Sequence, residues 1–186
     1  MDRALVESAQ HGDEDAFAAL MSMNGDRLMA IAYRILRDVS QAEDAVQETI
    51  VAAWRDLPDL RDPDRFPGWL YRVLVRACYA QAKHTRRWNA GVRVLISEPS
   101  DASNALMSVD DRDQLDRAFR RLPPEQRAIV VLHHYLGWGQ AEVAAMLDIP
   151  LGTVKSRLHY ATVALRAAVE ADSRTTSTAT SEERLA

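Results

Sequence analysis

The sequence contains little of several residue types on which secreted, membrane and β-sheet proteins depend. Its single cysteine, Cys78, excludes an internal disulfide and a zinc cluster built from cysteines. A membrane span needs about 20 consecutive apolar residues, and no stretch of the sequence is close to that length. The first residues lack the basic and apolar sections of a secretory signal. Aromatic residues are only 6% of the chain and glycines number 7. We therefore expect a helical, cytoplasmic protein without stable membrane insertion.

Motifs of catalysis are also missing from the sequence. Residues 152–156 contain Gly-Thr-Val-Lys-Ser, but the preceding glycine and the spacing of a phosphate-binding loop are absent. Neither a nucleophilic serine elbow nor a His-Glu-x-x-His zinc motif occurs. His133 and His134 are adjacent, so on a helix they point about 100° apart, with one expected at the edge of a core and the other exposed. We predict that the protein is not an enzyme and holds no metal or cofactor.

A helix, a tight turn and a second helix are predicted between residues 137 and 169. Val143, Ala144 and Leu147 fall at helical spacing before residues 148–152, where proline and glycine interrupt the pattern. The second helix is expected to begin at Thr153, which is a good N-cap residue. This arrangement is typical of a helix-turn-helix unit that binds DNA.

The second of these helices has one apolar stripe and one polar side. Its stripe consists of Val154, Leu158, Ala161 and Leu165, at intervals of four, three and four residues. An amphipathic helix with a solvated face gives the same pattern, but outward residues near the start of a recognition helix reach base edges. Arg157 flanks the stripe and is as suited to a phosphate or a carboxylate as to a base. The predicted DNA-binding residues here are Thr153, Lys155, Ser156, Arg157, His159 and Tyr160.

A second amphipathic helix is predicted around residues 42–54. Its buried stripe is expected to contain Ala42, Ala45, Val46, Thr49 and Ala53. The opposite face carries an apolar valine among polar side chains, which suggests a partner surface, although a solvated acidic face is the alternative. The residues of this face are Asp44, Gln47, Glu48 and Val51.

Charge is distributed unevenly along a chain whose formal net charge is -4. A basic stretch lies before an acidic one that extends over residues 98–116. Basic residues with an aromatic neighbour can bind backbone phosphates and stack an unpaired base, though such runs also occur at solvated helix ends. An acidic chain fits a factor whose DNA affinity depends on a larger basic partner. The predicted DNA-binding residues of the basic stretch are Lys83, Arg86, Arg87 and Trp88.

These motifs resemble one family. Residues 122–127, 144–147 and 152–159 look like the C-terminal promoter-binding domain of bacterial sigma factors of the extracytoplasmic-function group. Residues 44–54 and 66–73 are similar to the N-terminal domain of the same group, the part that binds core RNA polymerase and opens the promoter. The resemblance covers roughly residues 10 to 170. It implies three partners: core RNA polymerase through the face around Asp44, promoter DNA, and an inhibitory anti-sigma factor.

The expected architecture is all-α, with two small helical domains joined by a flexible linker. We place a domain for polymerase binding and the minus-ten element at residues 1–90, a linker at 91–111, a helix-turn-helix domain for the minus-thirty-five element at 112–172, and a disordered tail at 173–186. Relatives usually carry Asn and Asp where this chain has Arg76 and Ala80, beside the loop that would capture a flipped base.

Two other functions remain open at the level of sequence. A stand-alone helix-turn-helix regulator would bind an operator without polymerase, and a helical adaptor would bind only protein. The motif in residues 44–73 distinguishes the sigma factor from the regulator, because a sensor domain does not need a polymerase-binding helix of this kind.

Overall fold

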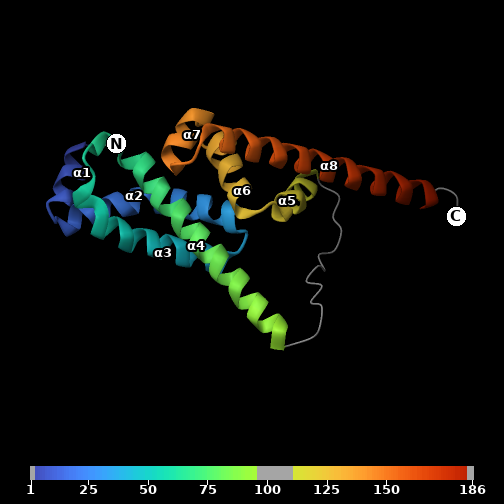
Figure 1. The fold of residues 1–186 in the computed structure, drawn as a ribbon, viewed down its shortest axis with the longest axis horizontal. Helices are drawn as coiled ribbons and strands as arrows, with labels where there is room; N and C mark the ends of the chain where they lie inside the picture. The colour runs from blue at the N-terminus through green and yellow to red at the C-terminus, as the bar shows by residue number, and fades with distance from the viewer. Residues whose placement is uncertain (1–2, 96–110, 184–186) are drawn as a thin grey trace.

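The computed structural model describes the backbone of residues 3–95 and 111–183, and side chains within residues 3–86 and 116–170 except that of Val169. Every regular element in these ranges is a helix, which confirms the predicted all-α class. Two helical units are separated by residues 96–110, which lie outside the described part of the chain (Figure 1). The expected flexible linker therefore falls mostly on residues that are not described.

The N-terminal unit is formed by four α-helices and two short 3-10 turns. The turns η1 and η2 connect α3 to α4 and bring the chain back across the end of the unit. The elements are α1 (Arg3–Gln10), α2 (Glu14–Leu36), α3 (Val39–Asp56), η1 (Leu57–Asp59), η2 (Pro63–Arg65) and α4 (Phe66–Leu95).

The C-terminal unit contains four α-helices and one π-helical turn, η3. Its last helix extends well beyond the others (Figure 1). The elements are α5 (Asp111–Arg121), α6 (Pro124–Val130), η3 (Val131–Tyr135), α7 (Gln140–Leu147) and α8 (Leu151–Glu183).

Local side-chain caps fix where α2 and α3 begin. The carboxylate of Asp13 accepts a hydrogen bond from the Ala16 amide at 3.0 Å, and that of Asp38 accepts one from the Gln41 amide at 2.9 Å. Each cap satisfies an amide that has no partner inside its helix. Arg37 ends α2 in the left-handed conformation, with a φ of 62°, and its amide donates to Tyr33. The sharp corner between α2 and α3 follows from these contacts.

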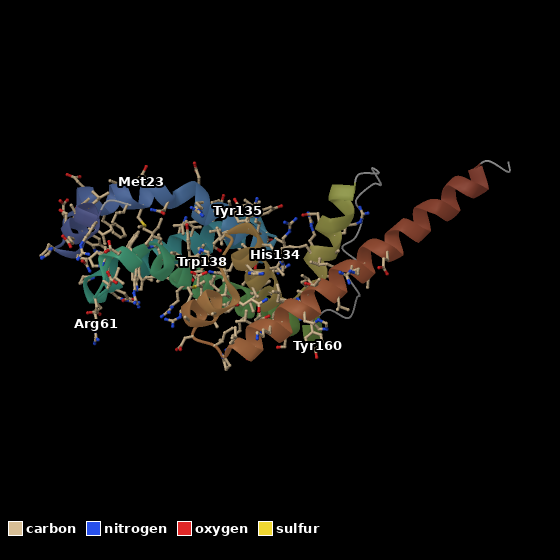
Figure 2. All side chains as sticks on the ribbon, turned by 90° about the horizontal axis from the view of Figure 1, so that it is seen from above. Met23, Arg61, His134, Tyr135, Trp138 and Tyr160 are labelled. Atoms are coloured by element: carbon tan, nitrogen blue, oxygen red, sulfur yellow. The ribbon has the colours of Figure 1, made fainter. Side chains whose placement is uncertain are left out.

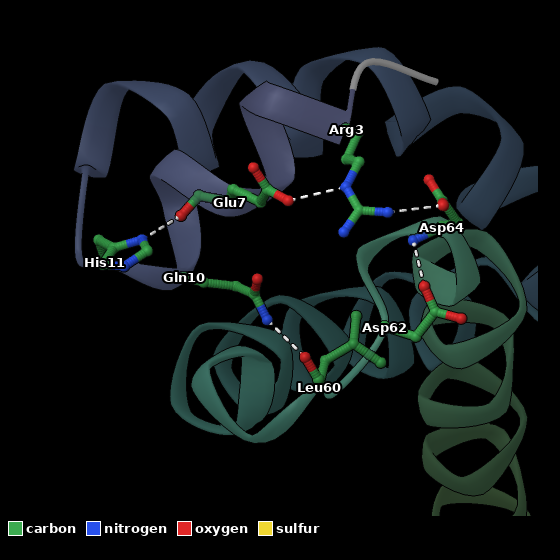
Figure 3. A network of polar contacts seen from close by, with 7 residues as sticks. All are labelled: Arg3, Glu7, Gln10, His11, Leu60, Asp62 and Asp64. Carbon is green, nitrogen blue, oxygen red and sulfur yellow. Dashed lines mark hydrogen bonds and ion pairs between the residues drawn. The ribbon is translucent and has the colours of Figure 1, made fainter.

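The small α1 is attached to the turns that precede α4 (Figure 3). The side-chain amide of Gln10 donates to the carbonyls of Leu57 and Leu60, at 3.1 and 2.6 Å. Arg3 pairs with Glu7 on its own helix and with Asp64 in η2, both at 2.8 Å. These polar contacts surround Val6, which is completely buried.

The alanine stripe predicted on α3 forms the centre of the N-terminal unit. Ala42, Ala45, Thr49 and Ala53 are buried without measurable exposure, and Val46 is half-buried. Small side chains let α3 pack against both α2 and α4. The Thr49 hydroxyl donates to the carbonyl of Ala45 at 2.6 Å, so its burial leaves no unmet hydrogen bond.

Two helices are longer than the sequence suggests. The helix α4 continues to Leu95, beyond the predicted domain end at residue 90. The helix α8 continues to Glu183, whereas a disordered tail is predicted from Ser173. Neither segment contains a proline, and adding a residue to an existing helix is far easier than starting a new one. Residues 184–186 lie outside the described chain.

The turn of the helix-turn-helix also differs from the prediction in one detail. Asp148 takes the left-handed conformation, with a φ of 56°, and α8 begins at Leu151 instead of Thr153. The carbonyl of Pro150 accepts hydrogen bonds from the amides of Thr153 and Val154, at 2.9 and 3.2 Å. Pro150 thus precedes the helix, and Thr153 lies within its first turn.

The two units pack directly against each other. The helices α6 and α7 contact α4, while α6 and η3 contact α2 (Figure 1). One continuous cluster of buried apolar side chains extends from Val6 in α1 to Leu158 in α8. Within the described residues no helix is long and apolar enough to cross a membrane.

Candidate polymerase and DNA interfaces

The outward face of α3, composed of Asp44, Gln47, Glu48 and Val51, is exposed as predicted. The Val51 side chain is 67% exposed. The Asp44, Gln47 and Glu48 side chains surround it on the same surface. We call these four residues the α3 face.

The α3 face borders a shallow open hollow between α3 and α4. Ala52 and Arg55 from α3 and Gln81 from α4 complete its lining. The Gln81 amide donates to Glu48 Oε1 at 3.0 Å, so α4 helps to orient one carboxylate of the face. No local sequence pattern identifies Gln81, because its partner Glu48 lies 33 positions away on another helix. A partner helix could place its own side chains in this hollow.

The apolar stripe of α8 packs as predicted. Val154 and Ala161 are fully buried and Leu158 nearly so. These side chains rest on α7 and α6 and hold α8 as the outer helix of the helix-turn-helix.

The polar side of α8 is presented outward. The Lys155, Ser156, His159 and Tyr160 side chains are all exposed, and Figure 2 shows Tyr160 projecting away from the body of the molecule. The Ser156 hydroxyl donates to the carbonyl of Thr153 at 3.1 Å. These side chains are therefore accessible from outside the molecule.

Arg157 and Thr153 occupy different positions from the other four residues of the predicted set. Both are half-buried, and Arg157 lies close enough to Tyr79 of α4 to influence its pKa electrostatically. Burial is the first cause of that shift and raises the Tyr79 pKa above its usual range, while the Arg157 charge lowers it. Arg157 thus faces the N-terminal unit, on the flank of the stripe as the spacing predicts.

The basic stretch predicted to bind an unpaired strand lies on the C-terminal half of α4. Lys83 and Arg86 are exposed on this helix. The side chains of Arg87 and Trp88 lie outside the described set, although their backbone belongs to α4. Arg76 and Ala80, the two departures from the family pattern, are also exposed on α4.

The aromatic side chains near this surface have different environments. Tyr71 is nearly fully buried, and its ring centroid lies 5.7 Å from that of Trp138, so it belongs to the core. Trp69 is half-buried, 5.9 Å from Phe66. Tyr79 is also partly covered, and its hydroxyl is buried without a hydrogen-bond partner.

The two adjacent histidines behave as predicted. His133 is half-buried and donates from Nδ1 to the carbonyl of Trp138 at 2.6 Å, while His134 is exposed. Within the described residues, His, Cys, Asp and Glu side chains form no group of three suited to a metal ion.

Comparison with known proteins identifies both units. Residues 20–88 match the family Sigma-70 region 2, and residues 112–165 match Sigma-70, region 4. The chain is 26% identical to the RNA polymerase sigma-H factor of Pseudomonas aeruginosa over 91% of its length and 94% of that protein. It is 30% identical to the ECF RNA polymerase sigma-E factor of Escherichia coli (strain K12), over 88% of this chain and 92% of that protein.

Solved structures agree with this assignment. CnrH, solved in complex with the cytosolic domain of CnrY, superposes with a TM-score of 0.63 and 28% identity, over 92% of this chain and 98% of CnrH. RpoE of Bartonella quintana, solved with the anti-sigma factor NepR, has the same fold, with a TM-score of 0.65 at 24% identity over 84% of this chain and 98% of RpoE.

The order and extent of these matches decide between the functions that the sequence left open. A stand-alone regulator or an adaptor would share the helix-turn-helix unit at most, whereas region 2 and region 4 both match here in sigma-factor order. The matches to the two sigma factors also extend over 88% or more of this chain, and so are not confined to one unit. The chain belongs to the extracytoplasmic-function group of RNA polymerase sigma factors.

Proposed function

We propose that this sigma factor binds core RNA polymerase through the α3 face, reads the upstream promoter element with α8, and holds the unpaired downstream strand along α4. As a member of its family, the protein directs transcription initiation with RNA polymerase and is not an enzyme. The observation that carries it is the exposed Val51 among the polar side chains of the α3 face.

An exposed apolar side chain ringed by polar ones resembles the centre and rim of a protein interface. Burying Val51 against a partner would remove apolar surface from water, and Asp44 and Glu48 at the rim would pair with basic groups. The neighbouring hollow, lined in part by Arg55 and Gln81, gives a partner helix room to insert side chains.

The DNA contacts divide by chemistry. On α8, Lys155 is suited to a phosphate, while Ser156 and His159 can donate to and accept from base edges. On α4, the charge of Lys83 and Arg86 can follow a strand backbone, and the predicted aromatic partner Trp88 can stack a base. We therefore place minus-thirty-five recognition in residues 112–172 and minus-ten recognition and melting in residues 1–90.

The α3 face is tested by charge reversal. The double substitution Asp44→Lys and Glu48→Lys should weaken binding to core polymerase by at least about tenfold in a fluorescence titration, which corresponds to about 1.4 kcal/mol. The far-ultraviolet circular dichroism should not change, because both side chains point outward and surface substitutions rarely unfold a domain.

A matched control separates the face from net charge. Asp26→Lys together with Asp59→Lys makes the same change in charge at exposed positions on α2 and η1. This control should bind polymerase as the wild type does. Equal affinity of both double variants and the wild type would remove the α3 face from the interface.

We also propose that an anti-sigma factor binds this chain and that the protein works in the cytoplasm. The support is family membership together with the structural neighbours, since RpoE was solved with an anti-sigma factor and CnrH with the cytosolic domain of CnrY. Co-purification of the tagged chain from its own cells, followed by mass spectrometry, should recover core polymerase and one inhibitor. Recovery of polymerase alone, from both stressed and unstressed cells, would contradict the proposal that an anti-sigma factor binds this chain.

A further inference from the structure

One part of the contact between the two units contains more arginine side chains than carboxylates to pair with them. It lies where α6 packs against α2 and α4, with α5 beside them. Four guanidinium groups gather there around two carboxylates, those of Asp116 in α5 and Glu125 in α6. We call the four arginines the arginine cluster; they are Arg37, Arg86, Arg120 and Arg127.

The two carboxylates are already shared among three of these arginines. Asp116 accepts hydrogen bonds from Arg37 and, at 3.0 Å, from Nε of Arg120. Arg86 Nη2 lies 3.8 Å from Glu125 Oε2, which is an ion pair without a close hydrogen bond. Four positive charges against two negative ones leave an excess of two positive charges among these six side chains.

The fourth arginine, Arg127, is only 7% exposed and has no carboxylate partner among the described side chains. Its Nη1 donates to the carbonyl of Arg120 at 3.3 Å, and its Nε is buried without a hydrogen-bond partner. Burial, followed by the nearby charge of Arg37, lowers the pKa of Arg127 to about 10, and Glu125 acts against this shift. A buried cation is costly unless a negative group compensates it.

The arginine cluster has a covered part and an exposed part. The Arg37 side chain is 11% exposed and lies over the ring of Tyr33, and its Nε is also buried without a partner. The Arg86 and Arg120 side chains are 62% and 57% exposed. Two covered arginines, each with one unused donor, therefore lie beneath two arginines that solvent reaches.

The contact between the units does not leave arginines unsatisfied elsewhere. Arg72 donates to the carbonyls of Ala145, at 2.8 Å, and of Met146, in the last turn of α7, where helical carbonyls lack partners. Nearby the contact is neutral, because Gly68 lies where a Cβ would be 3.5 Å from the ring of Trp138. Among the described arginines of this contact, a buried nitrogen without a partner occurs only in the arginine cluster.

We propose that the arginine cluster is a binding site for a small phosphate-bearing anion, of the class of pyrophosphate or the phosphate groups of a nucleotide. Guanidinium groups bind phosphate through paired hydrogen bonds, and the oxygens of one phosphate can serve more than one arginine. An anion that enters past Arg86 and Arg120 balances the excess charge and offers acceptors to Nε of Arg37 and of Arg127. Transcription supplies such anions, because RNA synthesis consumes nucleoside triphosphates and releases pyrophosphate.

The site goes beyond the proposed polymerase and promoter contacts and shares only Arg86 with them. A bound anion would connect side chains of α2, α4, α5 and α6, and so would strengthen the contact between the units. Because it binds the folded chain, it should also raise the melting temperature.

Isothermal titration calorimetry of the full chain with sodium pyrophosphate tests the site, with sodium chloride at matched ionic strength as the reference. The wild type should bind pyrophosphate saturably, and the melting temperature should rise with pyrophosphate but not with chloride. Arg120→Gln and Arg127→Met should each weaken binding by at least about fivefold, because each removes charge-assisted hydrogen bonds. Arg127→Met replaces a buried charge by an apolar side chain, and Arg120→Gln changes an exposed residue whose loss does not threaten the fold.

The matched control is Arg121→Gln, which removes the same charge from the neighbouring exposed position of α5. This variant should bind pyrophosphate as the wild type does. Equal affinity of all three variants and the wild type would place the anion elsewhere, and a wild type without saturable binding would overturn the site altogether.

An oligonucleotide distinguishes a free anion from the phosphates of a nucleic acid strand. Arg120→Gln and Arg127→Met should keep the wild-type affinity for a fluorescein-labelled single-stranded oligonucleotide of mixed sequence while losing affinity for pyrophosphate. If both variants instead lose oligonucleotide affinity, and pyrophosphate displaces the oligonucleotide from the wild type, the arginine cluster belongs to a strand-binding surface and the proposed site is wrong.

Discussion

At the scale of single residues, Cys78 reports on the packing of α3 against α4. It is completely buried, and burial raises its thiol pKa from 9.0 to about 12. The protonated thiol is favoured in the fold, so its contribution to stability is present below about pH 9 and is lost as the pH rises toward 12. At about pH 8 a thiol reagent should label Cys78 only at the rate of unfolding.

The same residue gives a pH-dependent test. The melting temperature should fall between about pH 8 and about pH 10.5 partly through Cys78, and Cys78→Ala should reduce that fall. Immediate, stoichiometric labelling of the native protein would show that the α3–α4 packing is open in solution.

We expect the exposed residues of α8 to divide into phosphate-binding and base-reading groups. Lys155→Ala should weaken binding of the isolated 112–172 fragment to duplex promoter DNA at all sequences and reduce the salt slope by about one. Ser156→Ala with His159→Ala should instead change which altered duplexes are preferred, with about 1 to 3 kcal/mol lost at a contacted base pair. An unchanged preference in a panel of duplexes would make both residues positioning groups.

At the scale of elements, the extension of α8 invites a deletion test. The region 4 match ends at residue 165, and the buried stripe of α8 ends with Ala161 and the half-buried Leu165. Truncation after Asp172 should therefore leave the melting temperature of the full chain within about 2 °C and its transcription activity unchanged, since surface changes rarely exceed about 0.5 kcal/mol. A large loss of either would assign a packing or binding role to residues 173–183.

At this scale, the buried and exposed sides of a helix could be predicted wherever apolar residues repeat with the helical period. The stripes of α3 and α8 and the outward sets around Asp44 and Lys155 follow from spacing alone, because burial repeats with the helical period. The start of α8 was predicted at Thr153, two residues after its actual start at Leu151. Pro150 and Gly152 both resemble turn residues, and only the hydrogen bonds show which of them the helix includes. The Ser- and Thr-rich extension of α8 was missed because composition gives weak information on helix propagation.

At the scale of the whole molecule, the packing of the two units could not be read from the sequence. The pairs Arg37–Asp116 and Arg72–Met146 join residues more than 70 positions apart, and neither partner carries a local pattern that identifies the other. Gly68 and Trp138 gave no signal for the same reason. The family resemblance predicts which surfaces act, and only the three-dimensional structure shows that α2 and α4 pack against α6.

Promoter opening tests the role assigned to α4. The triple substitution of Arg86, Arg87 and Trp88 by alanine should impair opening of a duplex promoter in a permanganate assay and be largely rescued on a premelted bubble. Unstacking a base costs a few kcal/mol, which stacking contributions of about 1 to 3 kcal/mol per base would offset. Equal loss on both templates would assign these residues to docking or folding.

Reconstituted transcription tests most directly whether this chain directs core RNA polymerase to promoters and binds it through the α3 face. Core RNA polymerase is incubated with the purified chain and genomic DNA fragments from the source organism, and the 5′ ends of the transcripts are sequenced. The wild type should produce starts that core polymerase alone does not, each preceded by the same pair of spaced elements, and the Asp44→Lys, Glu48→Lys variant should lose them. Absence of new starts, together with tight and specific DNA binding by the chain without polymerase, would contradict the account.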